Sequence, residues 1–264
     1  MQTSLNITFL GTGTSQGVPV IGCHCEVCTS NDPRDQRLRS SLLVNAEGKN
    51  LVIDTGPDFR QQMLREKIHR LDAVLITHGH KDHIGGMDDL RAFNYLRKDA
   101  VDVYARPEVQ VDIRREFFYA FHENKYPGVP EIRLHTIPSL LFYIDGLAVL
   151  PIELLHHRLP VVGFRIGNMA YLTDASSIPD PSIELLKNLD ILIINALRIQ
   201  PHISHFHLEG ALAIIERLKP ARAYLTHISH KMGLHAEIEK ILPSGVSQAF
   251  DGLNLQCQYN LASG

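Results

Sequence analysis

The sequence of 264 residues has no tryptophan, only four cysteines and no excess of basic residues. Its formal net charge of −3 argues against a strongly basic surface for nucleic acids, although it leaves room for a local patch. No apolar run approaches the roughly 18 residues that a membrane-spanning helix needs. The first residues, MQTSLNITFLGTGTS, lack the charged and then apolar regions of a signal peptide. These absences predict a cytoplasmic protein without a membrane span.

Three of the four cysteines crowd into the stretch GVPVIGCHCEVCTSND, as Cys23, Cys25 and Cys28. The fourth, Cys257, lies far away in the alternating, strand-like segment NLQCQYN. This spacing does not predict a disulfide framework and indicates thiolate chemistry in a reducing compartment. Three thiolates could hold a metal ion, but a closed tetrahedral zinc site needs four protein ligands. The fourth ligand must come from elsewhere in the chain.

Short apolar or alternating runs alternate with segments of helical spacing along the whole chain. Adjacent strands come first and strand–helix units later, which predicts sheets covered by helices in an α+β or α/β layered fold. We found no repeat, low-complexity tract or linker that would divide the chain, so one domain over 1–264 is expected. The predicted strands are 5–10, 41–45, 50–54, 73–77, 101–105, 151–156, 161–166, 169–174, 190–196 and 222–227, and the helices are 58–68, 86–96 and 209–219.

Histidine is unusually frequent, with fifteen residues, and many of them are clustered. The clusters are THGHKDH, LLHHRL, PHISHFH and LTHISH, and each follows a predicted strand or lies beside one. Side chains at strand ends and in the following loops are well placed to converge on one cleft. Clustering at these positions therefore indicates a site rather than a surface accident.

The strongest local pattern is VLITHGHKDHIGG, in which His78, His80, Asp82 and His83 follow an apolar strand. Histidines two positions apart can present both imidazoles to one ion, and the Asp-His pair can reach a second ion beside it. A solvated polar turn is the alternative. Four ligand-type residues within six positions, directly after a buried strand, favour the metal site.

The stretch THGHKDHIGG resembles the signature loop of the metallo-β-lactamase superfamily of dinuclear metallohydrolases. The resemblance extends over nearly the whole chain and implies a four-layer αββα sandwich that binds two divalent ions, Mn²⁺ or Zn²⁺, at one edge. His157 is chosen over its neighbour His156 because its spacing to Gly163-Phe164 matches the phosphodiesterase branches. Asp54 is expected to support the histidine loop without binding metal. The implied ligands are His78, His80 and His157 on one ion, Asp82, His83 and His227 on the other, and Asp174 between them.

The segment PHISHFHLEG contains His205, which resembles the additional histidine of the branch that includes ribonuclease Z and the phosphoribosyl cyclic phosphate phosphodiesterases. There it contacts the phosphate or protonates the leaving oxygen. The resemblance therefore implies hydrolysis of a small or cyclic phosphodiester by a metal-activated hydroxide, with His205 and Asp82 as catalytic residues. His202 and His207 are the neighbouring alternatives to His205.

His230, three residues after His227, can face away from the cleft and complete the set of Cys23, Cys25 and Cys28. A C-x-C-x-x-C loop paired with T-H-x-x-H closely resembles PhnP-type phosphoribosyl cyclic phosphate phosphodiesterases. It implies one structural Zn²⁺, because four protein ligands leave no open position for a substrate. Free buried cysteines are the alternative.

Other functions were weighed against this hypothesis. A ribonuclease Z-like tRNA endonuclease would need a long basic arm, whereas the candidate segment 121–138 is short and nearly charge-balanced. A thioesterase of the glyoxalase II type is disfavoured by His205, and an inactive scaffold by the full ligand set. The glycine-rich 11–17 lacks the G-K-[ST] ending of a P-loop and is interpreted as a tight turn beside the site. The expected partner is a small phosphodiester, without nucleic acid or membrane, and a homodimer is compatible with the resemblance.

Overall fold

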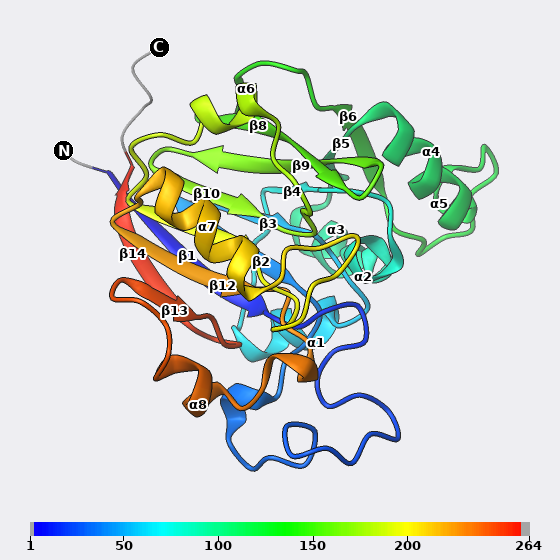
Figure 1. The fold of residues 1–264 in the computed structure, drawn as a ribbon. Helices are drawn as coiled ribbons and strands as arrows, with labels where there is room; N and C mark the ends of the chain where they lie inside the picture. Colours follow the sequence, from blue (N-terminus) through cyan, green and yellow to red (C-terminus); the bar gives the residue numbers. More distant parts are fainter. Residues whose placement is uncertain (1–2, 260–264) are drawn as a thin grey trace.

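Two seven-stranded sheets pack face to face in the computed structural model, which describes residues 3–259 (Figure 1). The strand order is β14-β1-β2-β3-β4-β5-β6 in the first sheet and β13-β12-β11-β10-β9-β8-β7 in the second. The first sheet contains β1 (Thr3–Gly11), β2 (Ser41–Ala46), β3 (Lys49–Ile53), β4 (Ala73–Leu75), β5 (Val101–Ala105), β6 (Ile132–Thr136) and β14 (Asn254–Tyr259). The second contains β7 (Phe142–Ile144), β8 (Leu147–His156), β9 (Leu159–Ile166), β10 (Met169–Leu172), β11 (Ile191–Asn195), β12 (Arg222–Thr226) and β13 (Val246–Gln248).

Both sheets are mixed and follow the same plan. Strands β14, β1, β2 and β3 pair antiparallel, and β3 to β6 pair parallel. In the second sheet, β7 to β10 pair antiparallel and β10 to β13 pair parallel. Parallel strands bring their carboxyl ends to one edge, where loops and their side chains can gather.

Three apolar clusters account for the layering. The inner cluster joins the facing sides of the two sheets, with Phe9 and Tyr171 among its fully buried members. A second cluster packs the outer face of the β7–β13 sheet against α6 to α8, and a third packs the other sheet against α1 to α5. This arrangement confirms the predicted αββα sandwich. The helices are α1 (Phe59–Arg65), α2 (Lys81–Ile84), α3 (Arg91–Arg97), α4 (Pro107–Glu116), α5 (Phe118–Phe121), α6 (Asp180–Glu184), α7 (Leu208–Leu218) and α8 (His235–Glu239), with short 3₁₀ turns η1 (Pro33–Asp35), η2 (Met87–Leu90) and η3 (His230–Met232).

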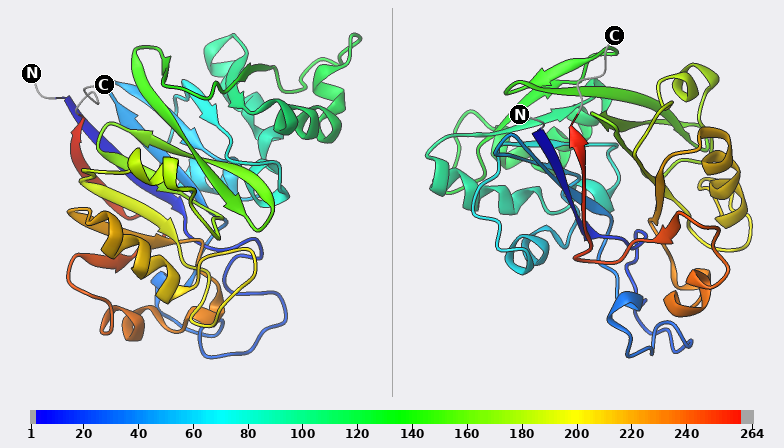
Figure 2. Two further views of the ribbon diagram at one scale, coloured as in Figure 1. Left: turned by 45° about the horizontal axis from the view of Figure 1, so that its top comes forward. Right: turned by 90° about the vertical axis from the view of Figure 1, so that its left-hand side faces the viewer.

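Every strand and helix predicted from the sequence has a counterpart, with ends that differ by a few residues. The prediction missed strands β6, β7 and β13 and helices α2, α4, α5, α6 and α8. Of these, α4 and α5 project from the body of the molecule (Figure 2). Only Val109 and Ile113 of α4 are buried, so its apolar stripe is short. Within residues 3–259, every helix falls short of the length and apolarity that a membrane crossing requires.

A buried arginine ties the N-terminal part of the chain to its C-terminal part. Arg37 donates to Thr12 Oγ1 at 2.9 Å, to the carbonyl of Ala249 at 2.5 Å and to His235 Nδ1 at 3.1 Å. Burial, reinforced by the guanidinium of Arg37, lowers the pKa of His235 to about 4. His235 is therefore neutral in the folded protein, where its Nδ1 serves as an acceptor.

We expect stability to fall in acid partly because of His235. Its pKa in the folded protein is below the ordinary value of 6.5. Between these two values the unfolded chain binds a proton at His235 and the folded protein does not. This contribution is absent above pH 6.5, grows as the pH falls and stops growing near pH 4. Between about pH 7.5 and about pH 5 it should amount to at most roughly 2 kcal/mol. Thermal melts of wild type and His235→Gln, which keeps an acceptor for Arg37, should show a smaller acid loss in the variant. Equal losses would contradict the assignment.

Candidate metal centre

Four strands of the sandwich are followed, within three positions, by a polar residue of the same group of side chains. Asp54 follows β3, His78 follows β4 after two residues, Asp174 follows β10 and His227 follows β12. Asp54, Asp174 and His227 have φ values of 65°, 57° and 55°, the left-handed region that side chains other than glycine rarely adopt. All three are at most 2% exposed. Backbone strain of this kind persists only where the surroundings hold it, and it is concentrated at functional sites.

Asp82, His83, Asp174 and His227 form one buried cluster of ligand-type side chains. The Nε2 atom of His83 lies 3.1 Å from Asp82 Oδ2 and 3.3 Å from Asp174 Oδ2, and His227 Nδ1 lies 3.1 Å from the same oxygen of Asp174. Burial opposes ionisation of Asp174, but positive charge on His227 and His83 holds its pKa well below the usual range. Two carboxylates at such close range favour a cation between them.

Asp54 orients His83 from behind, as the sequence predicted. Its Oδ2 accepts from His83 Nδ1 at 2.7 Å and from the Thr77 hydroxyl at 2.8 Å, and its Oδ1 accepts from the Thr77 amide at 2.9 Å. Because Nδ1 carries the proton in this bond, the lone pair of neutral His83 is on Nε2. Among the described residues, that buried Nε2 has no hydrogen-bond partner.

The raised pKa of His83 indicates that the side chains around it stabilise a positive charge. Burial lowers it, but the carboxylates of Asp174, Asp54 and Asp82 raise it well above the ordinary value. The pocket thus stabilises positive charge beside the Nε2 atom. A divalent ion ligated there would supply that charge, so the donor set fits a metal ion.

His78, His80 and His156 form the neighbouring group of imidazoles. His78 Nε2 lies 3.0 Å from His80 Nδ1, and the ring of His156 has its centre 5.8 Å and 5.3 Å from those of His78 and His80. His156 is also within ligand distance of Asp174. The two groups of side chains therefore meet at Asp174.

The assignment of His157 to this group is corrected by the structure. Strand β8 ends at His156, which pairs with Leu159 of β9, and His157 begins the turn between them. On the pleated strand His156 shares a face with Ile152 and Leu154, whereas His157 has left-handed backbone and is exposed. The adjacent histidine, set aside in the sequence analysis, is the one at the cluster.

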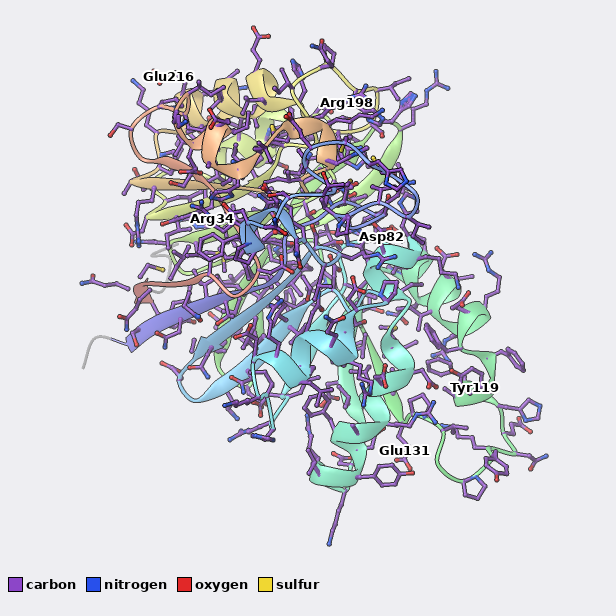
Figure 3. All side chains as sticks on the ribbon, turned by 90° about the horizontal axis from the view of Figure 1, so that it is seen from below. Arg34, Asp82, Tyr119, Glu131, Arg198 and Glu216 are labelled. Atoms are coloured by element: carbon purple, nitrogen blue, oxygen red, sulfur yellow. The ribbon has the colours of Figure 1, made fainter. Side chains whose placement is uncertain are left out.

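His205 comes from the loop before α7 and lies over the cluster. Its Nε2 is 3.0 Å from Asp174 Oδ1, and its ring has its centre 4.5 Å from that of His156 and 5.0 Å from that of His227. His202 lies behind it, with the two Nδ1 atoms 3.3 Å apart. His207 instead stands at the N-cap of α7, with its Nε2 3.8 Å from Glu209. Figure 3 shows Arg198, at the start of this loop, and Asp82 toward the same side of the molecule.

The glycine-rich segment 11–17 lies beside the cluster as a turn, as predicted. Thr14 places its hydroxyl 3.2 Å from His227 Nε2, and the Ser40 hydroxyl is 3.2 Å from His227 Nδ1. Sequence reasoning did not assign these two hydroxyls. The backbone of Thr14 and Thr12 also pairs with Ile228, which fixes the loop next to His227.

Cys23, Cys25, Cys28 and His230 form a second, separate cluster. Their sulfurs lie 3.3, 3.3 and 3.5 Å from His230 Nδ1. A hydrogen bond from the backbone of Cys28 is the main cause that lowers the pKa of Cys25 to about 6, so this thiol ionises readily. The donor set is that of a closed tetrahedral site, and it joins the loop after β1 to η3, next to His227 (Figure 1).

Replacing Cys25 with serine should lower thermal stability before it alters the chemical step. If the four side chains share a zinc ion, the purified protein should hold one zinc per chain that survives mild chelation. Loss of one thiolate weakens the tie between two distant loops, and we expect a melting temperature several degrees lower. Metal counting and thermal melts test this, with Cys257→Ser as the matched control that keeps the zinc. Equal zinc content in Cys25→Ser and wild type would contradict it.

Comparisons with known proteins agree with this geometry. Residues 49–228 match the family model of the beta-lactamase superfamily domain. A solved structure of a PhnP-family protein, described as a new diphosphatase, is 42% identical with a TM-score of 0.93, and the match covers 99% of this chain and 100% of that one.

Two curated relatives are longer than the chain. An octanoyltransferase of Porphyromonas gingivalis is 45% identical over 247 residues, which cover 92% of this chain and 50% of that protein. A ribonuclease Z of Nostoc punctiforme is 30% identical over 168 residues, or 62% of this chain and 47% of that protein. The chain thus spans about half the length of the curated relatives it matches. With the matching family model, the sandwich fold and the His/Asp cluster at its edge, the chain belongs to the metallo-β-lactamase superfamily.

Proposed function

We propose that the protein is a metal-dependent phosphodiesterase that hydrolyses a small or cyclic phosphodiester. The observation that carries the proposal is His205, whose Nε2 reaches Asp174 Oδ1 at 3.0 Å while its side chain keeps 12% of its surface exposed. A histidine placed over a metal-type cluster and open to the cleft can donate a proton to a departing oxygen. Alkoxides are poor leaving groups, so a diester substrate needs such a donor.

The roles of the other residues follow from their positions. Asp82, His83 and His227 would hold one ion, His78, His80 and His156 would hold another, and Asp174 would bridge them. Bound divalent ions lower the pKa of water and neutralise negative charge on phosphoryl oxygens. Asp54 keeps His83 in the Nδ1–H tautomer, and the Thr14 hydroxyl, at Nε2, can hold the ring of His227 while its Nδ1 faces Asp174. Asp82 lies at the cleft with 9% exposure and remains ionised, because His83 holds its pKa below the usual range against the effect of burial.

A diphosphatase is the second candidate, favoured by the 42% identical PhnP-family relative that bears this description. Both activities displace an oxygen from a phosphoryl centre that carries two substituents. They differ in the leaving group, because a phosphate leaves far more readily than an alkoxide. Dependence on His205 should therefore be strong for a diester and weak for a diphosphate.

A tRNA endonuclease is not favoured by the projection that flanks the cleft. Helices α4 and α5 and the following loop to 131 form this projection, whose lower part carries Tyr119 and Glu131 in Figure 3. Arg114 and Arg115 are accompanied there by Asp112 and Glu116, so the projection lacks a continuous basic surface. Non-specific binding of RNA depends on a continuous basic surface that contacts its phosphates.

The proposal is tested with protein loaded separately with Mn²⁺ and with Zn²⁺. Four substrates are compared, namely a phosphoribosyl cyclic phosphate, a nucleoside diphosphate ester, a thioester and a precursor tRNA. We expect turnover of the cyclic phosphodiester to exceed that of the others. Faster cleavage of the diphosphate would replace the proposal with the second candidate, and cleavage of the thioester alone would overturn both.

A further inference from the structure

We propose that Ser204 and His202 form a positioning pair that sets the orientation and tautomer of His205. This inference rests on the proposed function, in which His205 donates a proton to the leaving oxygen. Ser204 stands directly before His205 in the loop 197–207, and its three polar backbone and side-chain groups all contact histidines of the site.

The carbonyl of Ser204 anchors the loop to the cluster. It accepts a hydrogen bond from His156 Nδ1 at 2.7 Å. The proton of His156 is therefore on Nδ1, and the Nε2 lone pair is left for a metal ion. Ser204 is thus held in place by a residue of the cluster itself. Its hydroxyl, in turn, has a defined position relative to His205.

The amide and hydroxyl of Ser204 assign the proton on His205. The Ser204 amide donates to His202 Nδ1 at 3.3 Å, so that nitrogen is an acceptor without a proton. The hydroxyl lies 3.2 Å from His202 Nδ1 and 3.0 Å from His205 Nδ1. The one lone pair of His202 Nδ1 is already taken by that amide, so the hydroxyl donates its single hydrogen to His205 Nδ1. The proton of neutral His205 is then on Nε2, which donates to Asp174 Oδ1 at 3.0 Å.

This direction matters because it keeps a proton on Nε2 of His205, the nitrogen that faces Asp174. An imidazole without a partner on Nδ1 could rotate or exchange tautomers, and would present the working nitrogen for only part of the time. Ser204 and His202 are thus positioning residues, and the group that meets the substrate is His205. Supporting hydrogen bonds of this kind are typically worth about 10-fold to 100-fold in activity when removed.

The first test compares Ser204→Ala and Ser204→Thr with the wild type in zinc-loaded protein. Ser204→Ala removes only the hydroxyl and keeps the carbonyl that holds His156. We expect its kcat on a phosphodiester with an alkoxide leaving group to fall about 10-fold or more, with KM and metal content unchanged. Ser204→Thr restores a hydroxyl and should recover most of the loss. Wild-type kcat in Ser204→Ala, or a loss explained by missing metal, would overturn the inference.

A double-mutant cycle separates positioning from general damage. In a His205→Ala background, Ser204→Ala should cause no further loss, because nothing remains to be oriented. Independent, multiplicative losses would overturn the inference. The control is His207→Ala, two residues beyond His205 at the start of α7, which should retain wild-type activity.

A readout without substrate keeps this inference distinct from the proposed function. Nitrogen-15 NMR of the zinc-loaded protein reports which ring nitrogen of His205 carries a proton, with His205→Ala identifying its signals. We expect protonated Nε2 in the wild type and a mixture of tautomers in Ser204→Ala and His202→Ala. An unchanged spectrum in both variants refutes the positioning role, even if the protein hydrolyses phosphodiesters. A protein with the expected spectrum that hydrolyses none of the four substrates refutes the proposed function alone.

Discussion

Replacing Asp174 with alanine should abolish hydrolysis while the protein stays folded. Among residues 3–259, Asp174 is the one carboxylate found in two ligand-type groups, close to His83 and His227 on one side and to His156 and His205 on the other. Its loss would remove the carboxylate proposed to bridge two ions and the charge that would attract them. Because bound ions contribute several kcal/mol of charge stabilisation, we expect turnover to fall at least about 10³-fold.

The measurement is kcat/KM after the variant has been stripped of metal and reloaded, together with metal content and circular dichroism. Asp180→Ala is the matched control, since that carboxylate, on α6, is 85% exposed and forms an ion pair with Arg217 of α7. His80→Ala should reproduce the loss from the other group of ligands. Full activity in a reloaded Asp174→Ala protein would refute the dinuclear site. A variant that unfolds would leave His80→Ala to decide the question.

Replacing His205 with alanine should lower turnover by roughly 10²-fold to 10⁴-fold, the usual contribution of a general acid. His205 shares a possible ligand group with His156 and Asp174, but the other ligands proposed for each ion remain in the variant, so metal content should stay at the wild-type level. The loss should be greatest for a substrate with an alkoxide leaving group. It should shrink for bis-p-nitrophenyl phosphate, because p-nitrophenolate departs without a proton.

Turnover of the two substrates by His205→Ala and wild type is the measurement, with His207→Ala as the control. An equal loss for good and poor leaving groups would show that His205 positions the phosphate instead of protonating the leaving oxygen. A loss of metal in the variant would assign it to the ligand set. A strong loss for the diester and a weak one for a diphosphate would identify the diester as the substrate that requires the proton.

The sequence by itself determined the features that depend on local spacing. The run from His78 to His83 lies within one tight turn after a strand, so its residues must meet wherever the rest of the chain goes. Asp174 and His227 were assigned from the resemblance to a known family and located because each follows an apolar strand, and carboxyl ends of parallel strands share an edge of the sheet. The association of Cys23, Cys25 and Cys28 with His230 came from resemblance to a known motif, since some 200 residues separate its two parts.

Only the tertiary structure decided which histidine of the pair His156-His157 enters the cleft. Adjacent residues of a strand point to opposite faces, and the choice depends on where pairing with β9 stops. The same holds for Ser204, whose three contacts bring together separate segments, and for Arg37 with His235, which meet across 198 residues. No local pattern encodes these contacts, because they are made by strand register and by the packing of distant loops. Residues close together in the sequence could be assigned to the site from their spacing. Residues brought together by strand pairing and loop packing could not.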